Sequence, residues 1–177
     1  MSQIRYQIDP AHSSAHFAVR HMMIANVRGE FTKVSGSFSY DPENPANSAI
    51  DATIEVSSLH TNDPDRDQHL KSGDFLEADK FPQITFRSKS VTPEDGELAV
   101  RGDLTIHGVT REVKLTVEGP TPETKDPWGN TRVGATATGK INRKDFGLSW
   151  NVALEAGGVL VGEDVKLSLD VQGIRQA

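Results

Sequence analysis

Apolar residues recur at every second position along most of this chain, with polar residues between them. In the longest example, Leu98, Val100, Leu104 and Ile106 alternate with charged and hydroxyl side chains. A period of two is typical of a strand with one face buried and the other in water, and helical periodicity is nearly absent. The pattern predicts strands over residues 4–8, 15–19, 34–40, 52–56, 84–86, 98–106, 113–117, 133–141, 148–154 and 165–171.

Turn signals separate these strands, and one segment between them is expected to be helical. The turns are predicted at residues 41–45, 93–96, 107–108, 127–130 and 157–158. Connections this short join antiparallel neighbours. Asp63 is a capping residue followed by Pro64, and Lys71 and Gly73 stand where a helix would end. These signals predict a short helix within residues 63–73.

Many antiparallel strands with one apolar face bury that face either between two sheets or inside one closed sheet. The period alone leaves both open. Glycines within the strand patterns, at positions 29, 36, 102, 134 and 139, favour the bends of a barrel. About eight strands would enclose an interior that side chains just fill or that holds one small ligand. No linker or repeat divides the chain, so residues 1–177 are expected to form one domain.

Composition removes several classes of function. The 177 residues carry a formal net charge of −6, and no block of Lys and Arg occurs, which disfavours nucleic-acid binding. The absence of Cys excludes disulfides and thiol chemistry. No apolar run approaches the roughly 20 residues of a membrane-spanning helix. The first eight residues lack a secretory-signal pattern. We therefore expect a cytoplasmic location for the chain as written, and a periplasmic one if it is a trimmed mature form.

Candidate catalytic and metal-binding groups have simpler explanations. His16 and His21 fall on opposite faces of a regular strand, so they cannot meet at one ion with His12. The acids Asp63 and Asp65 suit the start of a helix electrostatically. No nucleophile elbow, phosphate-binding loop or dinucleotide fingerprint is present. The sequence therefore predicts no catalytic residue, no metal site and no cofactor.

The interior of the expected barrel is the remaining candidate for function. A solid core and a ligand cavity are equally compatible with its apolar residues. Small residues on the same faces would leave space for an apolar ligand unless neighbours fill it. These are Gly36, Gly102, Ala135, Ala137 and Gly139.

Short motifs in a fixed order resemble the YceI-like family of polyisoprenoid-binding proteins over nearly the whole chain. They are Asp9-x-x-His12-Ser13-x-x-x-Phe17-x-Val19-Arg20-His21, Gly29-x-Phe31, Gly36-x-Phe38, Arg66-Asp67-x-His69-Leu70-Lys71-Ser72-x-Asp74-Phe75, Phe81-Pro82, Gly102-x-Leu104-Thr105-x-His107-Gly108-Val109-Thr110, Asp126-Pro127-Trp128-Gly129-Asn130, Ile141-Asn142-Arg143-x-Asp145-Phe146-Gly147-Leu148-x-Trp150-Asn151 and Gly157-Gly158-x-Leu160-Val161-Gly162.

The resemblance implies a lipocalin-like, all-β, eight-stranded antiparallel barrel with one or two short helices. It implies an apolar tunnel that binds an isoprenoid chain, such as a polyprenyl lipid or the tail of an isoprenoid quinone, and it implies a homodimer. The candidate ligand-binding residues are Phe17, Val19, Arg20, Phe31, Phe38, Ile84, Phe86, Leu104, Ile106, Phe146, Trp150, Val152, Val165 and Leu167.

Polar residues of the motifs have two expected roles. Arg20 is placed to meet a polar or phosphorylated head group, and His12, Asp67, His69 and Asp145 are structural groups or lie near a mouth. The leading hypothesis is non-catalytic binding, storage or transport of an isoprenoid. One alternative is an enzyme that uses His69 and Asp67 as acid and base. A second is an interaction module of a stress response, with any bound lipid incidental.

Overall fold

The computed structural model describes residues 3–154 and 158–177, where the chain forms twelve β-strands, one α-helix and four 3-10 helices. The strands are β1 (Ile4–Ile8), β2 (Ser14–His21), β3 (Ala25–Phe31), β4 (Val34–Tyr40), β5 (Ala49–Glu55), β6 (Leu59–His60), β7 (Gln83–Glu94), β8 (Glu97–Ile106), β9 (Val109–Glu118), β10 (Thr124–Lys125), β11 (Thr131–Asn142) and β12 (Val161–Arg175). The helices are η1 (Pro10–His12), η2 (Pro45–Asn47), η3 (Val56–Ser58), α1 (Pro64–Leu70) and η4 (Arg143–Phe146). Of the predicted turn at 157–158, Gly157 lies outside the described residues.

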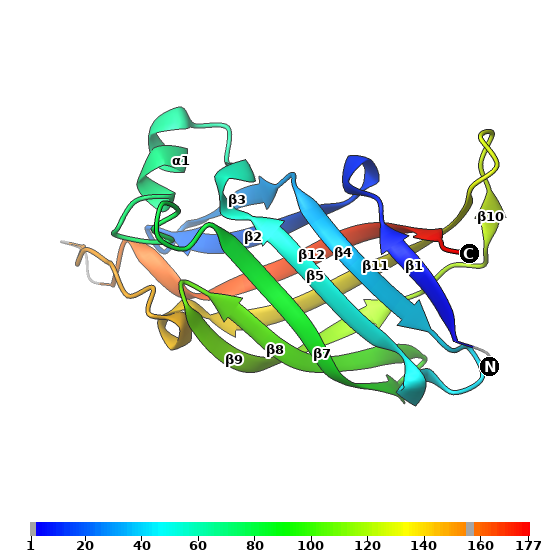
Figure 1. The fold of residues 1–177 in the computed structure, drawn as a ribbon. Coiled ribbons are helices and arrows are strands. Elements are labelled where there is room, and N and C mark those ends of the chain that lie inside the picture. The colour runs from blue at the N-terminus through cyan, green and yellow to red at the C-terminus, as the bar shows by residue number, and fades with distance from the viewer. Residues whose placement is uncertain (1–2, 155–157) are drawn as a thin grey trace.

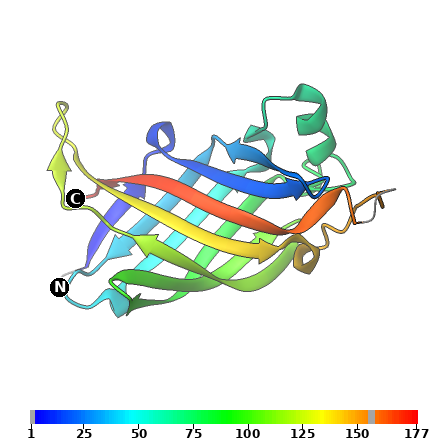
Figure 2. The ribbon, with the colours of Figure 1, turned by 180° about the vertical axis from the view of Figure 1, so that it is seen from behind.

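The strands form one antiparallel sheet that closes on itself (Figures 1 and 2). Most strands pair with their neighbours in sequence, and β12 joins the two ends of the sheet. One edge of β12 pairs with β11, and the other pairs first with β2 and then with β1. The prediction of a closed barrel is therefore confirmed over the alternative of two packed sheets, since no second sheet occurs among the described residues.

Three strands are interrupted by kinks and still follow continuous paths around the barrel. β1 and β2 flank η1, β3 and β4 flank residues 32–33, and β5 and β6 flank η3. Counted as single strands, these pairs give an eight-stranded barrel, with β10 as a short addition to β11 in the described part of the chain. Figure 1 shows α1 at one end of the barrel and both termini at the other. We call these the helix end and the termini end.

The alternation read from the sequence separates the inside of the barrel from the outside. In β8 the side chains of Val100, Leu104 and Ile106 are buried, while Arg101 and Thr105 between them are half-buried. A two-residue turn at Asp95 and Gly96, both with positive φ (53° and 82°), joins β7 to β8. The helix prediction is also confirmed, because Asp63 caps α1 by accepting from the amides of Asp65 and Arg66.

Two strand predictions need correction. Residues 148–154 do not form the predicted strand and contribute only an isolated bridge between Ala153 and Val159. Their polar groups are bound elsewhere, since the carbonyl of Leu148 accepts from the buried Arg143 guanidinium. Conversely, β3 was not predicted, because Gly29 and the polar residues around it hide its alternation.

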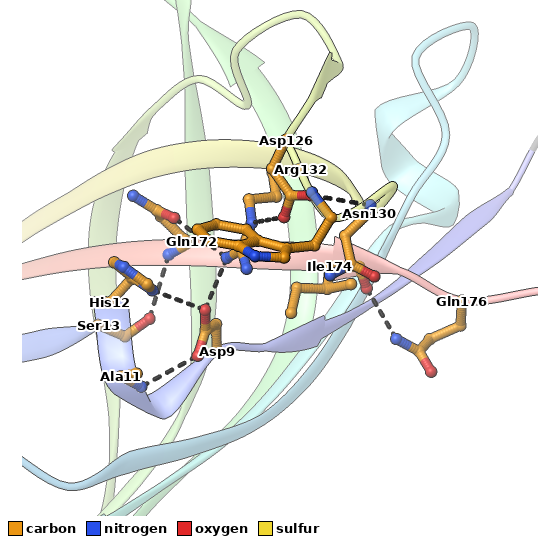
Figure 3. Close-up of polar contacts among 11 residues, drawn as sticks. Asp9, Ala11, His12, Ser13, Asp126, Asn130, Arg132, Gln172, Ile174 and Gln176 are labelled. Carbon is orange, nitrogen blue, oxygen red and sulfur yellow. Dashed lines mark hydrogen bonds and ion pairs between the residues drawn. The ribbon is translucent and has the colours of Figure 1, made fainter.

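Arg132 on β11 reaches across β12 and ties the interrupted first strand to β11 (Figure 3). Its Nη1 donates to Asp9 Oδ2 at 2.6 Å, and its Nε donates to Asp126 Oδ2 at 2.7 Å. These hydrogen bonds, with smaller contributions from His12 to Asp9, lower the pKa of both carboxyl groups to about 2.

Within the described chain, no helix combines the length and apolar character needed to cross a bilayer.

The first prediction concerns Gly102, where a Cβ atom would lie 2.5 Å from the carbonyl oxygen of Arg87 and 2.7 Å from Ser88 Cα. Gly102→Ala should lower the free energy of unfolding by about 1–3 kcal/mol, because the backbone of β7 must shift. Gly73→Ala is the matched control, since nothing lies within 4 Å of its added Cβ. Equal unfolding midpoints of the two variants in urea would contradict the close strand contact.

The second prediction concerns the pH dependence of the Arg132 contacts. A carboxyl group whose folded pKa is about 2 and whose ordinary pKa is 3.8 stabilises the fold fully above about pH 4 and loses this contribution as the pH falls toward 2. In Arg132→Gln both pKa values move back toward 3.8. The stability difference from the unmodified protein should therefore be largest at neutral pH and shrink between about pH 4 and pH 2.

Urea unfolding at several pH values measures this difference. Arg87→Gln is the control, because Arg87 and its partner Asp51 are exposed and 3.5 Å apart. A difference for Arg132→Gln that stays constant down to pH 2 would contradict the assignment.

Candidate ligand-binding cavity

A cavity of about 250 Å³, counted as the space open to the centre of a water molecule, runs through the barrel. Its wall is almost entirely apolar and draws on every strand of the eight-stranded barrel. The wall includes Ile8, Ala15, Phe17, Val19, Phe31, Val34, Phe38, Tyr40, Ile50, Ala52, Ile54, Leu59, Leu70, Phe75, Leu76, Ile84, Phe86, Val91, Leu98, Val100, Leu104, Ile106, Val113, Leu115, Val117, Ala135, Ala137, Ile141, Leu148, Val161, Val165, Leu167, Leu169 and Val171.

The cavity is long as well as apolar. On β12 alone its wall extends from Val161, near the helix end, to Val171. Ten strand residues rise roughly 33 Å, less any shortening at the irregular pairing near residues 161–165. An elongated apolar space suits an elongated apolar molecule.

The small residues that line the cavity are alanines rather than glycines. Ala52, Ala135 and Ala137 lie on the wall, as expected for two of them from the sequence. Gly36, Gly102 and Gly139 do not, and a Cβ added to any of them would meet a neighbour within 2.7 Å. The Phe86 ring lies over Gly102, the Leu115 side chain over Gly139 and the backbone of Asp51 against Gly36, so neighbours fill the space beside all three glycines.

The chain around α1 lines the helix end of the cavity. Leu70, Phe75 and Leu76 contribute to the wall there. The His69 ring meets both Phe75 and Trp150 edge-on, with ring centroids 5.1 Å and 4.8 Å apart. His69 and Trp150 thus support the wall from behind Phe75.

Arg143 fixes the segments that flank the same end. This guanidinium is only 3% exposed and donates to three carbonyl oxygens, those of Leu148 (2.6 Å), Gly162 (2.7 Å) and Val161 (3.2 Å). Burial lowers the pKa of Arg143, although Glu163 nearby raises it in part. Because a buried cation is costly without partners, its hydrogen bonds hold residues 148 and 161–162 in place.

Ten of the fourteen residues proposed from the sequence lie on the cavity wall. They are Phe17, Val19, Phe31, Phe38, Ile84, Phe86, Leu104, Ile106, Val165 and Leu167. All ten lie on strands. For nine of them the period of two correctly assigned the inner face, and Phe31 on β3 was proposed from the family resemblance.

The other four, Arg20, Phe146, Trp150 and Val152, lie off the wall. Arg20 is exposed on the outer face of β2, with its Cβ near Gly162. Phe146 is 1% exposed and packs in the core beside the cavity. The Trp150 ring contacts Phe75 at an interplanar angle of 59°, and Val152 is 47% exposed, because residues 148–154 form no strand that would turn them inward.

The sequence reasoning missed the wall residues Leu70, Phe75 and Leu76, which follow or end α1 and do not alternate. The signal that could have found them is this group of three apolar residues at and after the end of a helix that has no other apolar residue to bury.

The polar residues of the motifs are held by structural partners. Asp67 accepts from the amide and hydroxyl of Thr61. Burial raises the pKa of Asp67, but these hydrogen bonds outweigh it and the pKa is lowered. His69 Nε2 lies 2.9 Å from Asp74 Oδ2, so His69 and Asp67 have different partners. In the described ranges no three His, Asp or Glu side chains gather as a metal site would require.

Comparison with known proteins identifies the family. The family model described as the YceI-like domain matches residues 6–173. The chain belongs to the YceI-like family. Among its relatives, the UPF0312 protein SA2479 of Staphylococcus aureus (strain N315) is 41% identical over 168 residues, which are 94% of this chain and 95% of the relative. Protein YceI of Shigella flexneri is 38% identical over 177 residues, covering 97% and 87%.

Solved structures share the YceI-like barrel. The Campylobacter jejuni YCEI protein matches with a TM-score of 0.70 and 30% identity, covering 89% of this chain and 90% of that one. BcnA of Burkholderia cenocepacia matches with a TM-score of 0.77 and 23% identity over 93% and 98%. A polyisoprenoid binding domain from Saccharophagus degradans matches with a TM-score of 0.70 and 15% identity over 98% and 99%. The last two likenesses are of fold.

A third prediction tests the role of Arg143. Arg143→Met removes three charge-assisted hydrogen bonds and should lower the free energy of unfolding by about 3 kcal/mol. Amide exchange of Leu148 and Val161 should become faster. Lys144→Met, at a 47% exposed position in the same 3-10 helix, is the control. Unchanged exchange in Arg143→Met would contradict the assignment.

Proposed function

We propose that this protein binds a long-chain isoprenoid, either a polyprenyl lipid or an isoprenoid quinone, in the barrel cavity without chemically changing it. The observation that carries the proposal is the continuous apolar wall, which extends along β12 from Val161 to Val171. Family membership supports it, as does the fold shared with a domain whose title states polyisoprenoid binding.

The chemistry of the wall suits such a ligand. A polyprenyl chain has no groups that need directional contacts, and each buried methylene contributes about 0.8 kcal/mol. Aromatic rings at Phe17, Phe38 and Phe86 provide broad apolar contact, and the alanines at 135 and 137 provide room. The ten wall residues named from the sequence are the proposed contacts, together with Leu70, Phe75 and Leu76 at the helix end.

The arrangement of titratable groups favours binding over catalysis. His69 and Asp67, the pair considered for acid–base chemistry, are each bound to a different structural partner. A carrier or store of the lipid that acts without a cofactor fits this arrangement. The family resemblance adds the proposal that the protein is a homodimer. The head group of the ligand would remain at an end of the cavity, where water is accessible.

Binding is tested by titration in detergent-free buffer with a short polyprenol, a quinone with an isoprenoid tail, and the same quinone head group without the tail. The proposal expects saturable binding of both tailed molecules and none of the bare head group. Equal binding of the bare head group, or no binding of either tailed molecule, would refute it.

A fourth prediction places the ligand within the barrel. Ala137 lies on the wall and its neighbour Thr138 is exposed on the outside. Ala137→Phe should weaken polyprenol binding roughly tenfold or more, because the ring occupies the space of several methylenes. Thr138→Phe is the matched control and should bind as the unmodified protein does. Equal affinities of the two variants would place the ligand elsewhere.

A further inference from the structure

Exposed apolar side chains gather at the helix end of the barrel. Five large hydrophobic residues are exposed in the described part of the chain, and four of them, Met22 (45%), Met23 (52%), Ile24 (76%) and Val152 (47%), belong to this end. Backbone hydrogen bonds join their segments, since Met22 N donates to Leu160 O and Leu160 N donates to Val152 O. We call these four residues the apolar tip.

The turn at the centre of the apolar tip has side chains that its backbone does not favour. Met22 and Met23 both have positive φ, 52° and 64°, and Ile24 N donates to His21 O at 3.2 Å. Tight hairpin turns with two such residues strongly favour Asn and Gly. Two bulky apolar residues that are both exposed and strained at the backbone indicate a role other than folding.

Positive charge flanks the apolar tip. Arg20 precedes it by two residues, and Arg28 and Lys166 lie on either side of Ala18 on the outer face of the sheet. All three are exposed, and none of their side chains has a hydrogen bond or ion pair to another described residue. Among the described acids near these cations, Glu163 and Asp164 are paired with Lys144 and Lys140, and Glu30 lies 3.7 Å from His16. The surface beside the tip is therefore locally basic.

The apolar tip is also adjacent to the cavity. Val19 and Val161 are on the cavity wall, and Val161 pairs with His21 at the base of the turn. Exposed apolar residues beside unpaired cations match the surface of a bilayer. The apolar residues can enter the region of the acyl chains while the cations contact the anionic head groups above it.

We propose that the apolar tip inserts into the surface of an anionic lipid bilayer and that Arg20, Arg28 and Lys166 contact its head groups. The formal net charge of −6 repels an anionic surface, so docking occurs through the locally basic surface beside the apolar tip. The inference goes beyond the proposed function, because it requires no isoprenoid in the membrane and assigns a surface outside the cavity.

Docking is tested by sedimentation with vesicles of phosphatidylcholine alone and of phosphatidylcholine mixed with phosphatidylglycerol. The protein should sediment with the anionic vesicles, and less so as salt is raised. The triple variant Met22→Asn, Met23→Gly, Ile24→Thr suits the turn better than the native residues, so it should fold while binding roughly tenfold more weakly or worse. Trp128→Ser, which changes an 80% exposed residue in the β10–β11 turn at the termini end, is the control and should bind normally.

Charge is tested separately. Removing the three cations as Arg20→Gln, Arg28→Gln and Lys166→Gln should weaken binding roughly fivefold for each charge. Arg87→Gln, on the exposed outer face of β7, is the matched control. Because the chain has no Cys, Ile24→Cys and Trp128→Cys each accept a single environment-sensitive dye. Only the dye at position 24 should shift to the blue on vesicles.

Sedimentation of the triple variant equal to that of the native protein would overturn the proposal, as would a blue shift at position 128. A third result would also overturn it: the native protein does not bind vesicles, and the triple variant has a different oligomeric state. The tip would then be a contact between copies of the chain. Since these vesicles contain no isoprenoid, the outcome is independent of the polyprenol titration. Failure of docking and failure of ligand binding are therefore distinguishable.

Discussion

The double pairing of β12 is the interaction on which the structure depends. One edge of this strand binds β11, and the other binds β2 and β1, so the sheet has no open edge along β12. Closure fixes which side chains point inward, and the period of two then makes the inner face almost entirely apolar. The cavity is thus a direct consequence of strand pairing, and its chemistry is a consequence of the alternation.

The sequence predicted features that depend on local pattern. Alternation assigned Phe17, Phe86 and Leu167 to the inner face, and capping signals at Asp63 and Pro64 located α1. The local pattern could not show which hydrogen-bond partners a segment finds among residues distant in sequence. Residues 148–154 alternate, but Arg143 binds the carbonyl of Leu148, and no neighbouring strand takes up the segment.

Space inside the barrel was the hardest feature to predict, because it depends on which neighbours fill it. Gly102 and Gly139 are small, but Phe86 and Leu115 occupy the volume beside them. Ala135 and Ala137, by contrast, lie on the cavity wall. For the same reason Trp150 packs against His69 outside the wall, a contact between residues distant in sequence.

A ligand held by apolar contact alone should survive purification, because it gains nothing by returning to water. Native mass spectrometry of the protein isolated from its own cells without detergent, followed by solvent extraction, tests this most directly. The account predicts a stoichiometric added mass that the extract identifies as a polyprenyl lipid or an isoprenoid quinone. Protein without added mass that also fails to take up polyprenols and quinones offered to it would contradict the account.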